Sequence, residues 1–275
     1  VQKTKPKTKG LEADDAYIKP DENGTYVKEA QGQNYEDYVN ENYVHNYIAP
    51  EDAASLQKEI DNFNSKQNKK QNKNVELTIN TKGGVVSKAV IKDFEDRNGN
   101  KDITLFDAKT QSLNFALAAK EVNINTADLY FVPTNQTDST VTMTASAGNG
   151  KALVINYLLG KDFMLHTKLQ AVGLAGAFAP STTLIDVQWK DLCRQQERGF
   201  TFENRYASLT YHFTDGGTKY LSETGKETDK AIDEKIDWVA FKNQFFSAVM
   251  IAKHDFAENA LMTSIPQEKG SGFLK

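Results

Sequence analysis

The chain has 275 residues, of which 39% are hydrophobic, so it is long enough to bury a substantial core in one large or two modest domains. Its 33 basic and 37 acidic residues leave a formal net charge of −4, which gives no general attraction for a phosphate backbone and argues against nucleic acid as a partner. The single cysteine, Cys193, excludes an internal disulfide framework and is interpreted as a small core residue rather than a nucleophile. The sequence opens with VQKTKPKTKG and no apolar segment follows, so no signal peptide is expected.

The N-terminal part of the chain is polar and lacks a sustained hydrophobic period, so residues 1–73 are predicted to be an irregular linker. A short helix is expected near residues 51–63, where apolar side chains recur on one helical face. The run NSKQNKKQNKN comes next, and it cannot pack because it contains no apolar side chain. A folded domain is therefore predicted over residues 74–275.

From Val75 the hydrophobic period changes to two, which indicates β-strands. The runs VELTIN and VVSKAVIK flank a glycine pair, Gly83 and Gly84, and are predicted to form a hairpin. Similar runs follow with turn residues between them: ITLFD, SLNFALA, DLYFV, STVTMTA, KALVINYLLG, DFMLHTKLQA, TTLIDVQW and YASLTYHF. Turns are predicted at GNG (148–150), before KALVINYLLG, and at DGG (215–217), after YASLTYHF. Parallel neighbours would need helical crossovers, and the sequence shows none. It therefore predicts a mainly β, antiparallel fold in which sheets pair to bury their apolar faces.

The most apolar stretch of the chain is IDWVAFKNQFFSAVMIAKHDF, residues 236–256, which is too short and too interrupted by polar residues for a membrane span. Asp237 suits an N-cap, so we predict an amphipathic C-terminal helix over residues 237–252 that packs on the sheets as a lid. Its buried face is expected to comprise Trp238, Phe241, Phe245, Phe246 and Val249. A partner-binding face is the alternative, but an exposed stripe of this width would promote aggregation. On the buried interpretation, Phe245→Ala would cost about 3–5 kcal/mol of stability.

Catalytic and metal-binding patterns are not recognisable in the sequence. None of the four histidines has the spacing of a metal site or a catalytic pair, and His166 and His212 are expected on solvated strand faces. The acidic stretch DFEDRNGNKD at 93–102 fails as a calcium loop, because Gly99 at the sixth position would put Phe94 at the first ligand position. A hairpin turn is predicted there instead. No nucleophile-elbow, phosphate-loop or dinucleotide motif occurs, so we expect no catalytic residue, no cofactor and no metal.

Several sequence blocks resemble the large periplasmic domain of the YidC membrane insertase family. The most specific block is the last, in which a tryptophan is followed by FKNQFF. In chain order the blocks are NVELTINTKGGVVSKAVIKDF (74–94), LFD (105–107), INTADLYFVP (124–133), YLLGKDFMLHTKLQ (157–170) and KYLSETGKETDKAIDEKIDWVAFKNQFFSAVMIA (219–252). The resemblance runs from about residue 74 to the C-terminus, whereas the first 73 residues resemble only the variable linker of such proteins.

This resemblance implies a β-supersandwich akin to galactose mutarotases, with helices at its C-terminal side. It implies a location on the periplasmic side of the bacterial inner membrane, tethered by spans outside this sequence. The parent family inserts and helps fold inner-membrane proteins, alone or with the Sec translocon. The domain itself would be non-catalytic and cofactor-free, with Sec accessory subunits and nascent membrane proteins as the expected partners.

Two other functions stay open at this point. One is a mutarotase-like carbohydrate-binding or carbohydrate-active protein, which would need a histidine and a carboxylate converging in a cleft. Its candidate residues are His166, His212 and Glu203. The other is a structural spacer, which the sequence does not distinguish from an interaction domain.

Overall fold

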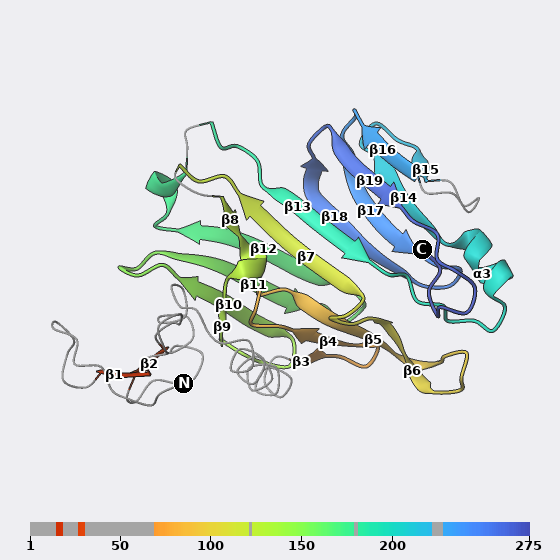
Figure 1. Cartoon of the computed structure of the whole chain (residues 1–275), viewed down its shortest axis with the longest axis horizontal. Coiled ribbons are helices and arrows are strands. Elements are labelled where there is room, and N and C mark those ends of the chain that lie inside the picture. Colours follow the sequence, from red (N-terminus) through yellow and green to blue (C-terminus); the bar gives the residue numbers. More distant parts are fainter. Residues whose placement is uncertain (1–14, 19–26, 31–68, 121–122, 179–180, 222–227) are drawn as a thin grey trace. The chain divides into compact units, whose positions relative to one another are not determined.

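The computed structural model describes residues 15–18, 27–30, 69–120, 123–178, 181–221 and 228–275. These residues form mainly β-strands arranged in antiparallel sheets, as the sequence predicts (Figure 1). The chain divides into two compact units. Unit 1 comprises residues 1–72, 78–86 and 113–187, and unit 2 comprises residues 73–77, 87–112 and 188–275. The helix predicted at 51–63 lies outside the described residues.

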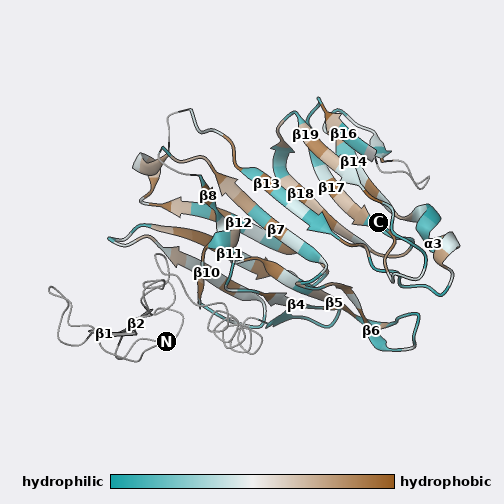
Figure 2. Ribbon diagram, in the orientation of Figure 1, coloured by the Kyte–Doolittle hydropathy of each residue, from teal (hydrophilic) through white to brown (hydrophobic). Residues whose placement is uncertain are grey.

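Unit 1 is built around a four-stranded sheet with the order β12-β11-β10-β9. Its strands are β9 (Val132–Thr134), β10 (Thr140–Ser146), β11 (Ala152–Leu159) and β12 (Leu165–Val172). Side chains alternate between a buried face and a more exposed one, and Figure 2 shows the corresponding change between hydrophobic and hydrophilic residues along the strands. The predicted turn before β11 contains Gly148 and Gly150, both with positive φ, a conformation that glycine adopts without steric cost.

The core of unit 1 is formed by inward-facing side chains of these strands and of the segments that pack on them. Its buried members are Ile79, Leu117, Phe131, Val141, Met143, Ala145, Leu153, Ile155, Tyr157 and Leu174. Tyr157 satisfies its buried hydroxyl by donating to the carbonyl oxygen of Gly84 at 2.8 Å. Two further antiparallel strand pairs lie outside this sheet. One is β1 (Asp15–Ile18) with β2 (Val27–Ala30), and the other is β7 (Gln111–Leu117) with β8 (Ile124–Asn125).

The predicted glycine-pair hairpin is confirmed as β4 (Val75–Ile79) and β5 (Val86–Glu95), which belong to the sheet β3-β4-β5-β6. The predicted turn at 93–102 is also confirmed, because β6 (Lys101–Phe106) pairs antiparallel with β5. The first strand, β3 (Lys69–Gln71), lies inside the run that was predicted to be an unpacked linker. Its Lys70 is buried and donates from Nζ to the carbonyl oxygen of Thr137 at 2.8 Å, and burial lowers the pKa of this lysine.

The remaining elements of the chain include short helices and one more strand pairing with β7. The strand β13 (Asp186–Asp191) gives the order β13-β7-β8. Among the described residues, the helices are η1 (Thr126–Asp128), η2 (Ala175–Ala177) and α3 (Phe200–Tyr206). The run DLYFV was predicted as a strand but contains the end of η1, and only its last residue, Val132, begins β9. Among the described residues, no helix is long and apolar enough to cross a membrane.

Unit 2 is built around the sheet β15-β14-β17-β18. Its strands are β14 (Ser208–Phe213), β15 (Thr218–Tyr220), β17 (Ile236–Lys242) and β18 (Ser247–Phe256), and a second pair is formed by β16 (Thr228–Ile232) and β19 (Ala260–Ser264). The buried core comprises Leu209, Tyr211, Leu221, Ile232, Ile236 and Met262. The DGG turn predicted after YASLTYHF joins β14 to β15.

The predicted C-terminal helix at 237–252 is wrong, because the segment forms β17, a tight turn and β18 instead. Asp237 is therefore no N-cap but a residue of β17. The apolar residues of this segment recur at spacings of two as well as three and four, so periodicity alone does not separate helix from strand. Its aromatic and β-branched side chains favour strands, and β14 supplies the pairing partner that makes the strand the lower-energy choice.

The same correction applies to the predicted buried face. Phe245 and Val249 are 60% and 50% exposed, so neither is a core residue. Trp238, Phe241 and Phe246 are half-buried. The first two are three positions apart in β17, and this odd spacing places them on opposite faces of the strand. The segment is part of the sheet rather than a lid placed over it.

Candidate functional site

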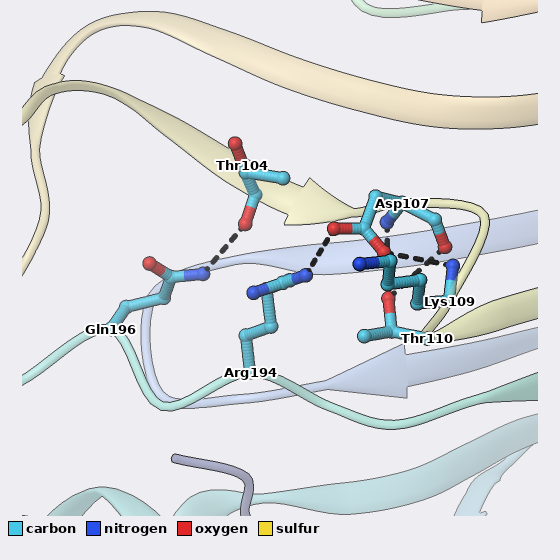
Figure 3. Close-up of polar contacts among 6 residues, drawn as sticks. All are labelled: Thr104, Asp107, Lys109, Thr110, Arg194 and Gln196. Atoms are coloured by element: carbon cyan, nitrogen blue, oxygen red, sulfur yellow. Dashed lines mark hydrogen bonds and ion pairs between the residues drawn. The ribbon is translucent and has the colours of Figure 1, made fainter.

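The main polar feature of unit 2 lies where the turn after β6 meets the segment before α3 (Figure 3). Asp107 organises the turn: its Oδ1 accepts from the backbone N–H of Lys109 at 2.9 Å, and its own N–H donates to Thr110 Oγ1 at 3.0 Å. Asp107 Oδ2 accepts a short hydrogen bond from Arg194 Nη2. Gln196 adds a second connection by donating from Nε2 to the carbonyl oxygen of Thr104 at 3.0 Å. The turn and the segment are thereby held together by side chains.

Asp191 and Arg194 carry the unusual electrostatics of this region. Burial raises the pKa of Asp191 to about 7; the nearby Arg194 lowers it and Asp107 raises it. Asp191 Oδ1 and Arg194 Nε are buried and have no hydrogen-bond partner among the described residues. Near pH 7 this carboxyl group is therefore protonated in part of the molecules, and its burial beside an ion pair reduces stability. Such buried titratable groups occur both in functional sites and in structural networks.

Glu203 is the buried anchor of the helix α3. Its carboxylate is fully buried and accepts the backbone N–H groups of Gln196, at 3.0 and 3.1 Å, and of Glu197, at 2.9 Å. Burial raises the pKa of Glu203, whereas these backbone donors lower it. Both carboxylate oxygens thus hold the loop before α3.

Next to this junction, unit 2 has an open polar cavity of about 460 Å³. It is lined by the β5–β6 turn, the segment 194–196 and the C-terminal residues 271–273. Its charged side chains are already engaged: Arg97 donates to Gln195 Oε1, and Asp96 accepts three hydrogen bonds within its own turn. The bonds from Asn100 lower the pKa of Asp96 most. The cavity therefore offers a surface for polar contacts.

The turn between β17 and β18 presents a second candidate surface. Asn243 is buried, and its Oδ1 accepts the backbone N–H groups of Phe245 at 3.0 Å and Phe246 at 2.7 Å. Its own N–H donates to the carbonyl oxygen of Phe246 at 3.0 Å. Phe246 packs edge-to-face against Phe94 with ring centroids 5.5 Å apart, while Phe245 points away from the core. The side-chain oxygen of Gln244 is buried and has no partner among the described residues.

The other residues of the predicted face make contacts within unit 2. Trp238 stacks on His212 with an interplanar angle of 8°, and Phe241 packs against Trp189 at 4.4 Å between ring centroids. His212 Nδ1 lies 2.9 Å from Asp237 Oδ1. The side chain of His212 is 28% exposed and stacked on Trp238, so it is less solvated than the sequence predicts.

The residues considered for carbohydrate chemistry do not form a recognised site. His166 is an exposed residue of β12 in unit 1, whereas His212 and Glu203 belong to unit 2. Within unit 2, His212 contacts Asp237 and Glu203 holds the loop before α3. Among the described residues, no group of three or more His, Cys, Asp or Glu could hold a metal ion.

Cys193 is partly buried in a short backbone pairing with the C-terminus. Its N–H donates to the carbonyl oxygen of Lys275 at 3.0 Å, and its carbonyl accepts from the N–H of Leu274 at 2.8 Å. Burial, followed by the nearby Asp191 and Glu203, raises the pKa of its thiol. A thiol with a raised pKa is mostly protonated and a poor nucleophile, in line with the interpretation from the sequence.

The polar junction and the asparagine turn were both missed from the sequence. Asp107 and Arg194 are 87 positions apart, and no local pattern connects them. The turn did have a signal, since Asn243 and Gln244 interrupt two runs rich in aromatic and β-branched residues, and asparagine is a preferred turn former.

Comparison with known proteins gives one consistent family. A family model described as "YidC periplasmic domain" matches residues 69–273. Three relatives, each named "Membrane protein insertase YidC", come from Phocaeicola vulgatus, Bacteroides fragilis and Porphyromonas gingivalis. They are 44%, 39% and 30% identical over 206 residues, which is 74% of this chain and 33%, 33% and 32% of the relatives. The chain thus spans about a third of the length of these proteins. No solved structure matches it.

Proposed function

The chain belongs to the YidC periplasmic domain family, and we propose from this premise that it is the periplasmic part of an insertase that helps inner-membrane proteins insert and fold. The family description places it on the periplasmic side of the inner membrane. The observation that carries the proposal is the match of residues 69–273, which covers nearly all of unit 2 and the part of unit 1 from residue 69 onward. The insertion activity is that of whole insertases, and this chain spans about a third of the length of such a relative.

Within that protein we assign the domain a non-catalytic role as an interaction module. The support is that the polar groups of unit 2 are used internally: Glu203 holds the loop before α3, and Arg194 pairs with Asp107. The exposed features are surfaces instead, namely the polar cavity and the turn that carries Phe245. A rigid antiparallel scaffold that presents surfaces suits binding better than bond-making chemistry.

At a finer level, we propose that the fold is a β-supersandwich of the galactose mutarotase type. Antiparallel sheets in both units and the dominance of strands over helices support this assignment. Resemblance of fold carries no sugar chemistry with it, because activity depends on a site and not on an architecture. Incubation of the chain with α-galactose should leave the spontaneous rate of mutarotation unchanged.

The proposed partners are accessory subunits of the Sec translocon and nascent membrane proteins. The test uses the full-length insertase and a version in which residues 69–273 are replaced by a flexible polar linker of matched reach. Loss of co-purification with the accessory subunits, together with slower insertion of a reporter membrane protein, would support an interaction role. Unchanged co-purification and insertion would instead make the domain a spacer.

Two matched charge-reversal variants test in the same assay whether the polar cavity binds the partner. Lys101→Glu changes the charge of the polar cavity at an exposed position, whereas Lys151→Glu makes the same change at an exposed position in unit 1. If the cavity binds a partner, only the first variant reduces co-purification. Equal effects of the two variants would show that net charge, and not the cavity, matters.

A further inference from the structure

The turn between β17 and β18 exposes the aromatic side chain of Phe245 to solvent. Phe245 is 60% exposed, although a phenylalanine in a globular protein is usually buried. The turn also includes Phe246, which packs on Phe94, itself 49% exposed, so three phenylalanine rings gather at one end of the hairpin. We call Phe94, Phe245 and Phe246 the aromatic tip. An exposed apolar feature of this kind marks a contact with a protein or a membrane.

The aromatic tip is held rigidly by its own backbone hydrogen bonds. Asn243 Oδ1 accepts from the N–H groups of Phe245 and Phe246, and the N–H of Asn243 donates to the carbonyl of Phe246. Three backbone donors of the turn are therefore satisfied before anything binds. These three bonds fix the backbone of the turn and reduce the cost of moving it into a less hydrated medium.

We propose that the aromatic tip contacts the bilayer surface by inserting Phe245 into the interfacial region of the inner membrane. The inference rests on the proposed function, because the family places this domain on the periplasmic side of that membrane. The tip is a convex turn and not a groove, so it fits a fluid surface that has no shape of its own. Lys242, which precedes the turn, has a flexible stem that lets its ammonium group reach lipid phosphates while the rings lie deeper.

The charged residues near the tip have both signs, with Lys242 before the turn and Asp93 and Glu95 beside Phe94, and this does not favour electrostatic adsorption. Next to Phe94, Asp93 forms an ion pair with Lys101 at 3.6 Å. The whole chain carries a net charge of −4, which does not favour anionic lipid. Binding is thus expected to depend on burial of the rings and to change little with salt or with the fraction of anionic lipid. The contact is weak alone, and tethering to the membrane raises its effective concentration.

The experiment adds a third tryptophan, as a reporter at the tip, to this 275-residue chain, and the emission of Trp189 and Trp238 is subtracted with the unchanged chain. Phe245→Trp is titrated with phosphatidylethanolamine–phosphatidylglycerol vesicles and with neutral phosphatidylcholine vesicles. We expect a blue shift of tryptophan emission with both lipids and quenching by lipids that carry a shallow quencher. The matched control is Phe202→Trp, an equally accessible phenylalanine on α3 whose reporter should keep its emission wavelength.

A second variant measures the affinity. Phe245→Ser should reduce the vesicle-bound fraction at limiting lipid by about tenfold, whereas Phe202→Ser should leave it unchanged. Both positions are exposed, so circular dichroism should show the same fold in each variant. No blue shift of Phe245→Trp with either lipid would overturn the proposal, and so would a shift confined to anionic vesicles and abolished by salt. A shift that depends on protein concentration without lipid would point to a second copy instead. None of these results would bear on the deletion test of the proposed function.

Discussion

Replacing Asn243 by alanine is expected to lower the free energy of unfolding of unit 2 by about 2–3 kcal/mol. The side chain is buried, and the substitution removes the acceptor of two backbone hydrogen bonds, at 3.0 Å to Phe245 and 2.7 Å to Phe246. Each backbone N–H that is left without a partner costs about 1–3 kcal/mol if water does not replace the lost acceptor. We take the lower end of this range for each bond because the turn lies partly at the surface.

Urea denaturation followed by tryptophan fluorescence measures this loss selectively. The two tryptophans of the chain, Trp189 and Trp238, both belong to unit 2, so their emission reports on that unit even if unit 1 unfolds separately. Asn243→Asp is the matched control, since it keeps the acceptor oxygen of the turn and replaces Nδ2, which lies 3.5 Å from the carbonyl oxygen of Arg194, by a second oxygen. The aspartate variant should lose less stability than the alanine variant when its carboxyl is protonated at low pH. If both variants lose the same amount, or if alanine costs less than about 0.5 kcal/mol, the turn does not depend on the acceptor and the reasoning fails.

Three further outcomes follow from burial, titration and backbone geometry. Phe245→Ala should reduce the free energy of unfolding by less than about 1 kcal/mol because the Phe245 ring is exposed. Phe131→Ala removes a fully buried ring and should reduce it by about 3–5 kcal/mol. Thermal melts compare the two variants, and equal losses of stability would contradict the burial assigned to one of the rings. The pKa of Asp191 is raised to about 7 in the folded chain, so the folded state binds this proton more tightly than the unfolded state does. The free energy of unfolding should therefore fall by roughly 2–4 kcal/mol as the pH rises from about 4 to 8. Asp191→Asn should remove this slope in urea titrations and be the more stable protein near pH 8; an unchanged slope would show that another group titrates. Gly84→Ala should reduce the free energy of unfolding by at least about 2 kcal/mol, because φ is +66° at Gly84 and a Cβ atom would lie 2.8 Å from the Phe131 ring. An unchanged melting temperature would mean that the hairpin accommodates the added methyl group without strain.

The hairpins were predictable because their signals are local. The glycine pair at Gly83 and Gly84, the 93–102 turn, the GNG before β11 and the DGG after β14 each combine turn residues with alternating strands, and each is a turn in the structure. Turn chemistry acts over a few residues, so a sequence contains all the information that it needs. The antiparallel class follows from these short connections.

The C-terminal segment shows where local reasoning fails. Between Ile236 and Phe256 most positions are apolar, and such a run satisfies helical and strand periods together. Pairing with β14 makes the segment a strand, since Leu209 and Tyr211 of β14 pair with Phe241 and Val239 of β17. Burial of Phe245 was inferred from a helix that does not form, and the ring is exposed because it sits in the turn between two paired strands.

The candidate sites depended even more on tertiary structure. Arg194 and Asp107, or Gln196 and Thr104, meet across 87 and 92 positions of the chain, and neither pair leaves a recognisable spacing in the sequence. Glu203 could be named from the sequence, but its role as a buried acceptor of three backbone hydrogen bonds could not.

The sequence by itself determined the strand-rich class, the positions of the short turns and the family resemblance, because hydrophobic alternation and turn chemistry are properties of neighbouring residues. Only the tertiary structure decided which strands pair, which carboxyl group is buried beside which guanidinium, and which phenylalanine faces water. Those outcomes depend on contacts between residues that are distant in the chain, and on the free energy of burying or pairing groups that no local pattern brings together.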